Sequence, residues 1–317
     1  MSNLERSPTV TVAADCRPTA AEPVHELLEA REVDLGEGMP VRRLLPKRER
    51  ATVGAWCFVD HFGPLEVAGR PGMRVAPHPH IGLQTVTWLV EGEVLHRDSL
   101  GNRQPIRPGQ LNLMTAGRGI AHSEESPPER PPRLHGLQLW TALPSRSSGV
   151  APAFEHHPRL PTVQASGIAV TVLLGELLGR RSPARAFSDL VGADLEVAGA
   201  VDQDLPLRPD FEHAVVALSG EAAVGGVSLR PGRLLYLGSD RRRVAVRTAG
   251  PARLFLLGGV PFGEPLIVWW NFVAHGADEI ARAHADWRSG ARFGEVRGFD
   301  GPALPAPPLP AGRLRPR

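Results

Sequence analysis

The hydrophobic pattern of the first half of the chain predicts many short β-strands separated by turns. Residues 83–90 are β-branched and apolar on both faces, as expected for a strand buried in a barrel or sandwich. Further candidate strands cover 52–59, 94–97, 107–114 and 134–143, and Gly, Pro, Asn and charged residues interrupt them roughly every ten residues. This spacing is typical of a small β-barrel or a β-sandwich.

The second half of the chain repeats this pattern. Residues 215–221 resemble 86–93, and residues 229–234 resemble 106–111, in the same order. We therefore expect an internal duplication, that is, an all-β chain with two β-barrel domains in tandem. The only clear helical periodicity runs from Phe272 to Trp287, which predicts one C-terminal helix.

The length of the chain also favours two domains, because 317 residues exceed what one compact core usually holds. Segments rich in Pro, Ser and Gly suggest where these domains begin and end. We expect a disordered tail over 1–22, an N-terminal domain with the candidate metal ligands over 23–145, a linker over 146–165, a metal-free C-terminal domain over 166–299 and a flexible Pro-rich tail over 300–317.

Composition narrows the class of protein. A net charge of +2 gives no reason to expect directly bound nucleic acid. Two cysteines, Cys16 and Cys57, cannot form a disulfide framework. There is no signal-peptide pattern, and no apolar run approaches the roughly 20 residues that span a bilayer. We therefore expect a soluble, cytoplasmic protein that does not associate with a membrane.

Two pairs of potential metal ligands lie at the ends of the segment 72–125. His78 and His80 are two residues apart, and so are His122 and Glu124. In a β-strand, residues i and i+2 point to the same face. If both segments are strands that lie side by side, three imidazole nitrogens and one carboxylate oxygen converge on one point. Such a donor set suits Fe(2+), Mn, Co, Ni, Cu or Zn.

Several motifs together resemble the pirin family, whose members are bicupins of the cupin superfamily. Gly72 and the following His78-x-His80 match the first cupin motif, and Gly119-x-x-His122 matches the core of the second. The resemblance extends to the segments 78–87, 115–124, 135–140, 263–265 and 269–273. It covers most of residues 35–290 and implies two cupin barrels, with one iron in the N-terminal barrel.

The resemblance also implies the ligands and the chemistry. It assigns the metal to His78, His80, His122 and Glu124. One position departs from the general cupin motif, which has Glu where this chain has Gln84. We expect Glu124 to take that place, with Glu125 as the alternative carboxylate. The activity implied is that of a quercetinase, a quercetin 2,3-dioxygenase-type oxidoreductase that cleaves a flavonol or related phenolic with O2, with Glu124 as the catalytic residue.

A flat aromatic substrate needs apolar walls beside the metal. Candidate pocket residues are Phe58, Trp88, Met114 and Trp140, although each also suits an ordinary core. Arg118 is a further candidate, because it could steer an anion or hydrogen-bond to Glu124. His135 is a candidate for a position behind the ligands, where it would orient them.

Two other functions fit the same residues. The family is also associated with regulation through protein partners, so the chain could be a non-enzymatic metal- or redox-dependent regulator that binds a protein partner. A stress-related metal-binding protein without turnover is the third possibility. We favour the enzyme, because four protein ligands leave positions open on a six-coordinate ion, and structural metal sites usually leave none.

Overall fold

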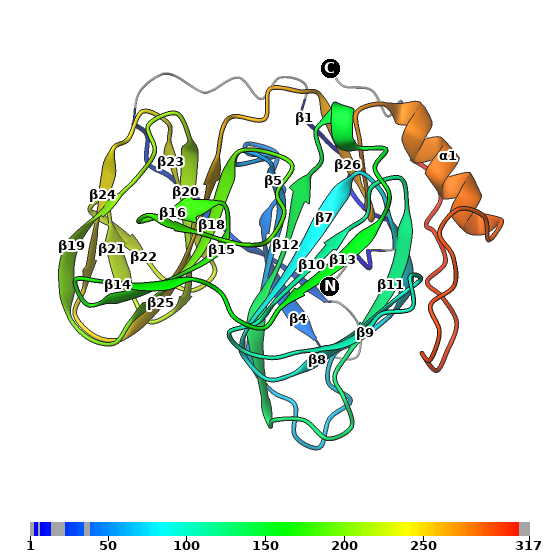
Figure 1. Cartoon of the computed structure of the whole chain (residues 1–317), viewed down its shortest axis with the longest axis horizontal. Coiled ribbons are helices and arrows are strands. Elements are labelled where there is room, and N and C mark those ends of the chain that lie inside the picture. The colour runs from blue at the N-terminus through cyan, green and yellow to red at the C-terminus, as the bar shows by residue number, and fades with distance from the viewer. Residues whose placement is uncertain (1–2, 6, 14–22, 35–38, 311–317) are drawn as a thin grey trace.

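The structure is a computed structural model that describes residues 3–5, 7–13, 23–34 and 39–310. Two β-barrel domains lie side by side, and one α-helix, α1 (Ala277–Arg288), covers the outer side of the first domain (Figure 1). The predicted class, all-β with two barrels in tandem and one C-terminal helix, is confirmed.

The first domain packs a seven-stranded sheet against a four-stranded sheet. The order in the seven-stranded sheet is β13 (Ala153–His157), β10 (Leu111–Thr115), β7 (Leu83–Glu91), β12 (Arg133–Ala142), β5 (Trp56–Glu66), β4 (Pro40–Leu45) and β3 (Arg31–Asp34). The order in the four-stranded sheet is β6 (Arg74–His80), β11 (Ile120–Glu125), β8 (Val94–Asp98) and β9 (Arg103–Ile106).

The second domain has the same plan. Its seven-stranded sheet runs β2 (Glu26–Glu29), β23 (Arg233–Gly238), β20 (Glu212–Ser219), β25 (Ala252–Gly259), β18 (Leu190–Val197), β15 (Ile168–Leu174) and β14 (Thr162–Ala165). Its four-stranded sheet runs β19 (Val201–Pro206), β24 (Arg243–Thr248), β21 (Ala222–Val224) and β22 (Val227–Leu229). The strand orders of the two domains match one for one, so the predicted duplication is confirmed. The remaining short elements are the hairpin β16 (Glu176–Leu177) and β17 (Arg180–Arg181), and the 3-10 turn η1 (Ser145–Ser147).

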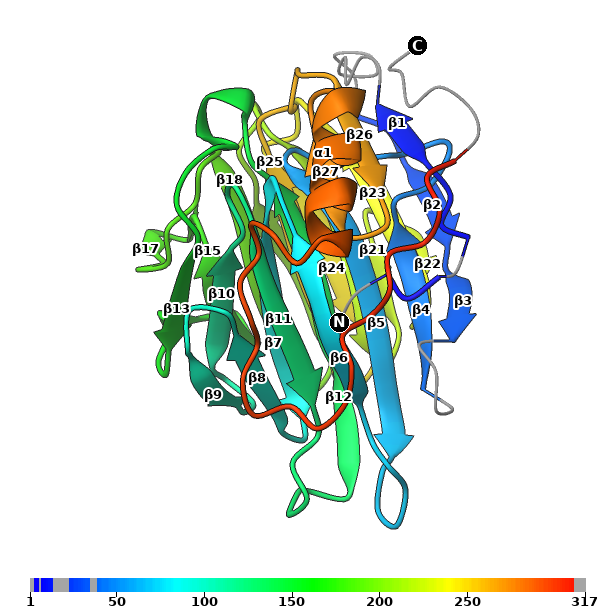
Figure 2. The same ribbon diagram turned by 90° about the vertical axis from the view of Figure 1, so that its right-hand side faces the viewer.

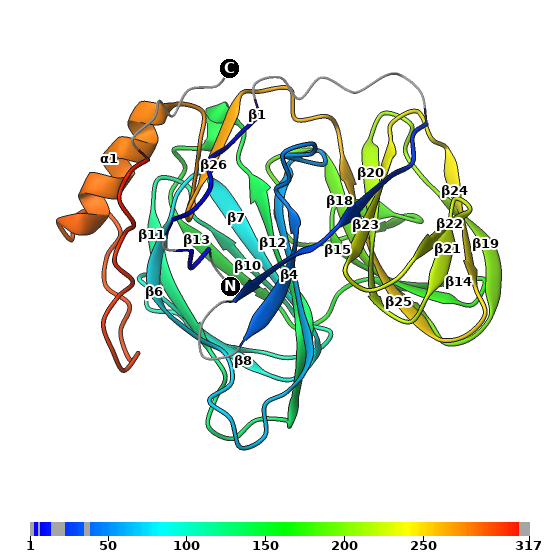
Figure 3. The ribbon, with the colours of Figure 1, turned by 180° about the vertical axis from the view of Figure 1, so that it is seen from behind.

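One edge strand of the second domain comes from the N-terminal part of the chain. β2 precedes the first domain in sequence but pairs with β23 of the second domain. The N-terminal segment therefore crosses from one barrel to the other (Figure 3). The expected linker 146–165 contains two strands, because β13 pairs with β10 and β14 pairs with β15. Sequence patterns gave no sign of these pairings, since they do not specify which edges meet.

The chain returns from the second domain to the first. β26 (Leu266–Trp269) pairs with β27 (Phe272–Ala274) and also with β1 (Thr11–Ala13). The expected disordered tail 1–22 therefore contains a strand, while Cys16 lies outside the described residues. The predicted helix 272–287 begins later, at Ala277, because its first residues form β27.

The Pro-rich C-terminal segment is ordered where the structure describes it, in contrast to the expected flexible tail. The Leu304 N–H donates to Pro77 O at 2.8 Å, beside His78, and the Trp287 Nε1–H donates to Leu304 O at 2.8 Å. Figure 2 shows this segment and α1 lying over the four-stranded sheet of the first domain. Residues 311–317 of the expected tail lie outside the described part.

An apolar core joins the two seven-stranded sheets. Trp56 from the start of β5 is fully buried in it, and its Nε1–H lies 3.1 Å from Val191 O and 3.2 Å from Gly258 O of the second domain. The same core contains side chains from both sheets, among them Leu44, Val86, Leu137, Val216, Leu234 and Phe255. The barrels therefore bury apolar surface against each other.

No helix in the described part of the chain is both long enough and apolar enough to cross a bilayer.

Candidate metal centre

The inner face of three neighbouring strands carries six polar side chains. His122 on β11 lies opposite His78 on β6 and opposite Asp98 on β8. Glu124 lies opposite His96 on β8. Directly opposed residues in an antiparallel pair point to the same face. The strands that bear the predicted ligands are therefore neighbours, which is the arrangement that the two i, i+2 pairs require.

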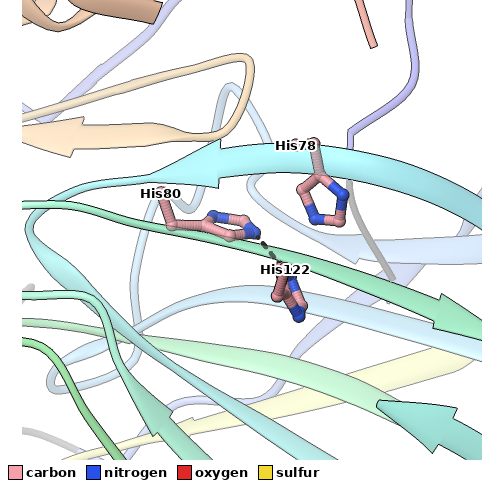
Figure 4. A group of neighbouring side chains, drawn as sticks. All are labelled: His78, His80 and His122. Carbon is pink, nitrogen blue, oxygen red and sulfur yellow. Dashed lines mark hydrogen bonds between the residues drawn. The ribbon is translucent and has the colours of Figure 1, made fainter. Parts of the chain in front are cut away.

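His78, His80 and His122 come together inside the first barrel (Figure 4). Their rings are 4.3–4.9 Å apart between centroids, and one ring nitrogen from each lies within 4.8 Å of the others. The Nε2 atoms of His80 and His122 are 3.1 Å apart. All three side chains are fully buried.

Hydrogen bonds orient two of these imidazoles. The Nδ1 of His78 lies 2.8 Å from Ala76 O, and the Nδ1 of His80 lies 3.0 Å from Asn271 O. A backbone carbonyl only accepts, so each Nδ1 carries the proton and each Nε2 keeps its lone pair. This is the tautomer that binds a metal through Nε2, held by a partner on the far side of the ring.

Asn271 comes from a tight turn of the C-terminal segment. The turn joins β26 to β27 through Trp270 and Asn271, and Trp270 has a positive φ of 53°. A bulky residue is rarely found in this conformation, and such strain persists where the surroundings require it. Here the turn places the Asn271 carbonyl against His80, so a segment beyond the second barrel completes the surroundings of a histidine in the first.

The donor set and its spacing fit a first-row divalent ion. Two nitrogens bound at right angles to one ion, each at about 2.1 Å, are separated by about 3.0 Å. The separation of 3.1 Å between the Nε2 atoms of His80 and His122 agrees with this geometry. Glu124 does not belong to this group of three; it groups with His96 and His122, so only His122 is common to both sets of donor atoms. Imidazole nitrogens combined with a carboxylate oxygen are donors that several first-row ions accept.

Burial keeps the three imidazoles neutral. It lowers the pKa of His78 to about 3, and burial together with the neighbouring imidazoles places the pKa values of His80 and His122 well below the ordinary range. Neutral imidazole is the form that ligates a metal, so no proton has to leave these rings at neutral pH.

Glu124 lies at the other side of His122. Its carboxylate groups with His122 and His96 in a second set of donor atoms within 4.8 Å of one another. The Thr87 hydroxyl lies 3.2 Å from Glu124 Oε1 and 3.0 Å from Gln138 Oε1. Both oxygens are acceptors, so the single hydroxyl proton of Thr87 is donated to one of them at a time.

Gln84, which occupies the glutamate position of the general cupin motif, is not part of this cluster. Its amide nitrogen donates to Thr115 Oγ1 at 2.9 Å and to Arg185 O at 3.0 Å. It therefore serves a hydrogen-bond network elsewhere in the barrel, whereas Glu124 lies beside the imidazoles.

The predicted pocket residues fall into two groups. Phe58 stacks on Trp140 at 3.9 Å between centroids, Trp140 lies edge-on to His80 at 5.2 Å, and Met114 packs in the same cluster. Trp88 instead belongs to the core between the domains, and Arg118 is exposed.

A cleft of about 660 Å³ opens next to this aromatic layer. It is lined by Arg43, Phe58 and Trp270 together with the N-terminal residues Asn3 and Glu5. Phe58 and Trp140 therefore lie between the cleft and His80. The buried Arg43 is held by Asp60 in a paired hydrogen bond of 2.9 and 2.8 Å.

His135, predicted to lie behind the ligands, pairs with His61 instead. Their Nε2 atoms are 2.8 Å apart, and neither belongs to the groups of converging donor atoms found in the described residues.

Sequence reasoning missed His96, Asp98, Thr87 and Asn271. Two of them carried a signal, because His96 and Asp98 are spaced i, i+2 at the end of the predicted strand 94–97, like the histidines of β6. Which strand lies beside β8 could not be derived from that spacing.

The matching face of the second barrel is apolar. On β19, β24 and β21, the strands equivalent to β6, β11 and β8, the buried positions include Leu205, Val244, Val246 and Val224. Among the described residues, every group of three or more converging His, Cys, Asp or Glu donors lies in the first barrel. The second barrel is thus built as an ordinary apolar core.

Two tandem barrels, with a buried His and Glu cluster in the first, define a metal-binding bicupin. The Pirin family model matches residues 38–141, and the model of the Pirin C-terminal cupin domain matches residues 192–294. The chain belongs to the pirin family.

Individual relatives agree with this assignment. A protein of Pseudomonas aeruginosa named "Putative quercetin 2,3-dioxygenase" is 49% identical over 98% of both chains. Human pirin is 31% identical, over 82% of this chain and 90% of its own. A crystal structure of quercetin 2,3-dioxygenase from Acinetobacter baumannii superposes with a TM-score of 0.89 and 41% identity, over 91% of this chain and 97% of that one.

Proposed function

We propose that this protein is an iron-dependent dioxygenase of the quercetinase type that cleaves a flavonol or related phenolic with O2. The observation that carries the proposal is the meeting of three buried imidazoles, two of which have Nδ1 tied to a carbonyl and so present Nε2 to the cluster. Two similar proteins, 49% and 41% identical, bear the name of this activity and support the choice of substrate class.

The residues that would hold the ion are His78, His80, His122 and Glu124. Four protein ligands leave two positions of a six-coordinate ion for exogenous oxygen donors. Bound there, Fe(2+) supplies a redox-active centre that can accept O2 and a phenolic oxygen. Mn, Co, Ni, Cu and Zn are the alternatives that the same donor set admits.

The chain itself supplies positioning, a dry environment and a base. The carbonyls of Ala76 and Asn271 hold His78 and His80 in the ligating tautomer. Burial of the whole cluster excludes bulk water from the reacting atoms. We assign to Glu124 the role of accepting the proton of the phenolic hydroxyl, with the Thr87 hydroxyl orienting the carboxylate.

We further propose that the substrate approaches through the 660 Å³ cleft. Phe58 and Trp270 give it aromatic walls suited to a flat ring system. Because Phe58 and Trp140 separate the cleft from His80, these side chains must shift for a phenolic oxygen to reach the cluster.

The test begins with the metal. The protein is loaded anaerobically with Fe(2+), its metal content is measured, and O2 uptake is followed with flavonols and simple phenols. We expect uptake that depends on both iron and substrate. His80→Ala should lose most of the metal and the uptake while keeping the far-UV circular dichroism of the parent, because the barrel walls and the second domain do not need that side chain.

His157→Ala is the matched control, since His157 is a histidine of β13 that pairs with Glu155 and not with the cluster. It should keep both metal and uptake. A fully iron-loaded protein that consumes no O2 with any phenolic would exclude the dioxygenase. Unchanged metal content in His80→Ala would exclude the site itself.

A further inference from the structure

His96 connects the predicted metal site to a buried carboxylate. Its Nδ1 lies 3.3 Å from the Nδ1 of His122, and its Nε2 lies 3.2 Å from Asp98 Oδ2. The side chain is 2% exposed and stacks on Phe154 at 4.5 Å between centroids. The imidazole is therefore fixed between His122 on one side and Asp98 on the other.

Asp98 is held firmly. Its Oδ1 accepts from the backbone N–H of Leu100 at 2.9 Å and of Asn102 at 3.0 Å, and the Asn102 amide donates to Oδ2 at 2.8 Å. These donors make Asp98 an acceptor on both of its oxygens.

The positions of the protons follow from this arrangement. Because Asp98 Oδ2 accepts from His96, the Nε2 of a neutral His96 carries the proton and its Nδ1 has a lone pair. The facing Nδ1 of His122 must then be the donor. A neutral His122 with its proton on Nδ1 presents the Nε2 lone pair toward His80, whose Nε2 lies 3.1 Å away. Both hydrogen bonds that link Asp98 to His122 through His96 then have one donor and one acceptor.

We propose that His96, oriented by Asp98, is a positioning residue that fixes the tautomer and ring orientation of His122 and so directs its Nε2 to the ion. The inference rests on the proposed metal site. His96 gives His122 the same kind of support that the carbonyls of Ala76 and Asn271 give to His78 and His80. The difference is that the acceptor is a side chain, and it can therefore be replaced.

The competing reading makes His96 a ligand, since His96, His122 and Glu124 also form a group of close donor atoms. In that reading, His122 would bind through Nδ1. The Nε2 of His122 would then carry a proton and point at His80. The unprotonated Nε2 atoms of His78 and His80 would have no third imidazole nitrogen with which to share an ion. When His96 instead supports His122 from the Nδ1 side, the Nε2 atoms of His78, His80 and His122 are all free of protons and available to the ion.

Two substitutions separate these roles. In His96→Asn the side-chain oxygen takes approximately the place of Nδ1, so it can still accept from His122. In His96→Gln the amide reaches approximately the place of Nε2 and leaves the Nδ1 position empty. The affinity of the full-length protein for Co(2+) is measured by chelator competition, and the ligand-field spectrum of the Co(2+) form is recorded.

Loss of such a supporting partner typically weakens metal binding by about 10- to 100-fold. We expect His96→Gln to show a loss of this size and His96→Asn to stay within about threefold of the parent. The Co(2+) spectrum should keep its band pattern in His96→Asn, because the ligands are unchanged. Arg97→Ala on the same strand, whose side chain pairs with Glu125, is the control and should bind like the parent.

Each other result overturns the inference or the proposal beneath it. Equal affinities of His96→Gln and His96→Asn, at the parent value, would show that His96 does not position His122. A loss as large as that of His80→Ala in both variants, with an altered Co(2+) spectrum, would make His96 a ligand. Failure of the parent itself to bind Co(2+) or Fe(2+) would instead contradict the proposed metal site.

Discussion

Trp56 offers a sharp test of how the two barrels stabilise each other. Its side chain is fully buried in the core between the domains, and its Nε1–H faces two carbonyl oxygens of the second domain. Replacing a buried Trp by Ala costs about 3–5 kcal/mol. Trp56→Phe keeps most of the apolar contact but leaves those carbonyls without this donor, which costs about 1–3 kcal/mol.

The position facing Trp56 allows a double-mutant cycle. A Cβ placed on Gly192 would lie 2.8 Å from Trp56 Cζ2, so Gly192→Ala overpacks the interface and should cost about 1–3 kcal/mol. In the Trp56→Ala background the extra methyl enters the space that the indole leaves. We therefore expect Gly192→Ala to be neutral or stabilising there, with a coupling energy above about 1 kcal/mol.

The free energy of unfolding is measured by urea titration with far-UV circular dichroism, and metal affinity by chelator competition. The pairing of β5 with β12 shifts register between Phe58 and Trp56, so Phe58 packs with Trp140 inside the barrel while Trp56 lies in the interdomain core. Affinity should therefore stay at the parent value. The exposed Leu100→Ala is the control, within about 0.5 kcal/mol of the parent. A loss in Trp56→Ala no larger than in this control, or strict additivity with Gly192→Ala, would refute the reasoning.

Two further predictions concern buried charges. Burial raises the pKa of Glu212, whose Oε2 accepts from the Tyr236 hydroxyl at 2.6 Å. Its folded pKa exceeds the unfolded one, so stability falls as pH rises between them. In urea titrations from pH 4 to 8, Glu212→Gln should lose less stability with rising pH than the parent, whereas the exposed control Glu221→Gln should behave like the parent. A Glu212→Gln variant whose free energy of unfolding depends on pH as that of the parent does would contradict the raised pKa. Asp60→Ala removes the buried carboxylate that accepts two hydrogen bonds from Arg43 and leaves Glu5, at 3.5 Å, as its acidic partner. The change should cost about 3–5 kcal/mol; a loss below about 1 kcal/mol would contradict that role.

The sequence predicted the ligand pairs because a strand has a fixed period. His78 and His80 must share a face, and so must His122 and Glu124, wherever the strands lie. The duplication was also visible, since two landmarks recur in order. These features depend only on local geometry and on repeated patterns along the chain.

Other features depend on which strand edges meet, and local patterns do not specify that. His96 joins the site only because β8 lies beside β11. β2 joins the second barrel by pairing with β23, which lies far from it in the sequence. Asn271 hydrogen-bonds to His80 although the two residues are 191 positions apart. The Pro-rich stretch after residue 300 resembled a free tail, yet Leu304 hydrogen-bonds to Pro77 next to a predicted ligand.

The inner faces of the two barrels differ in a way that bears on stability. The first barrel places four imidazoles and two carboxylates on its inner face, where an apolar core would otherwise contribute stability. The equivalent face of the second barrel carries Leu and Val, and the interface between the barrels adds a further apolar core. The segment after the second barrel supplies the carbonyl that orients His80. The second barrel therefore contributes apolar packing to the fold, and the segment that follows it contributes a hydrogen bond to the candidate site of the first barrel.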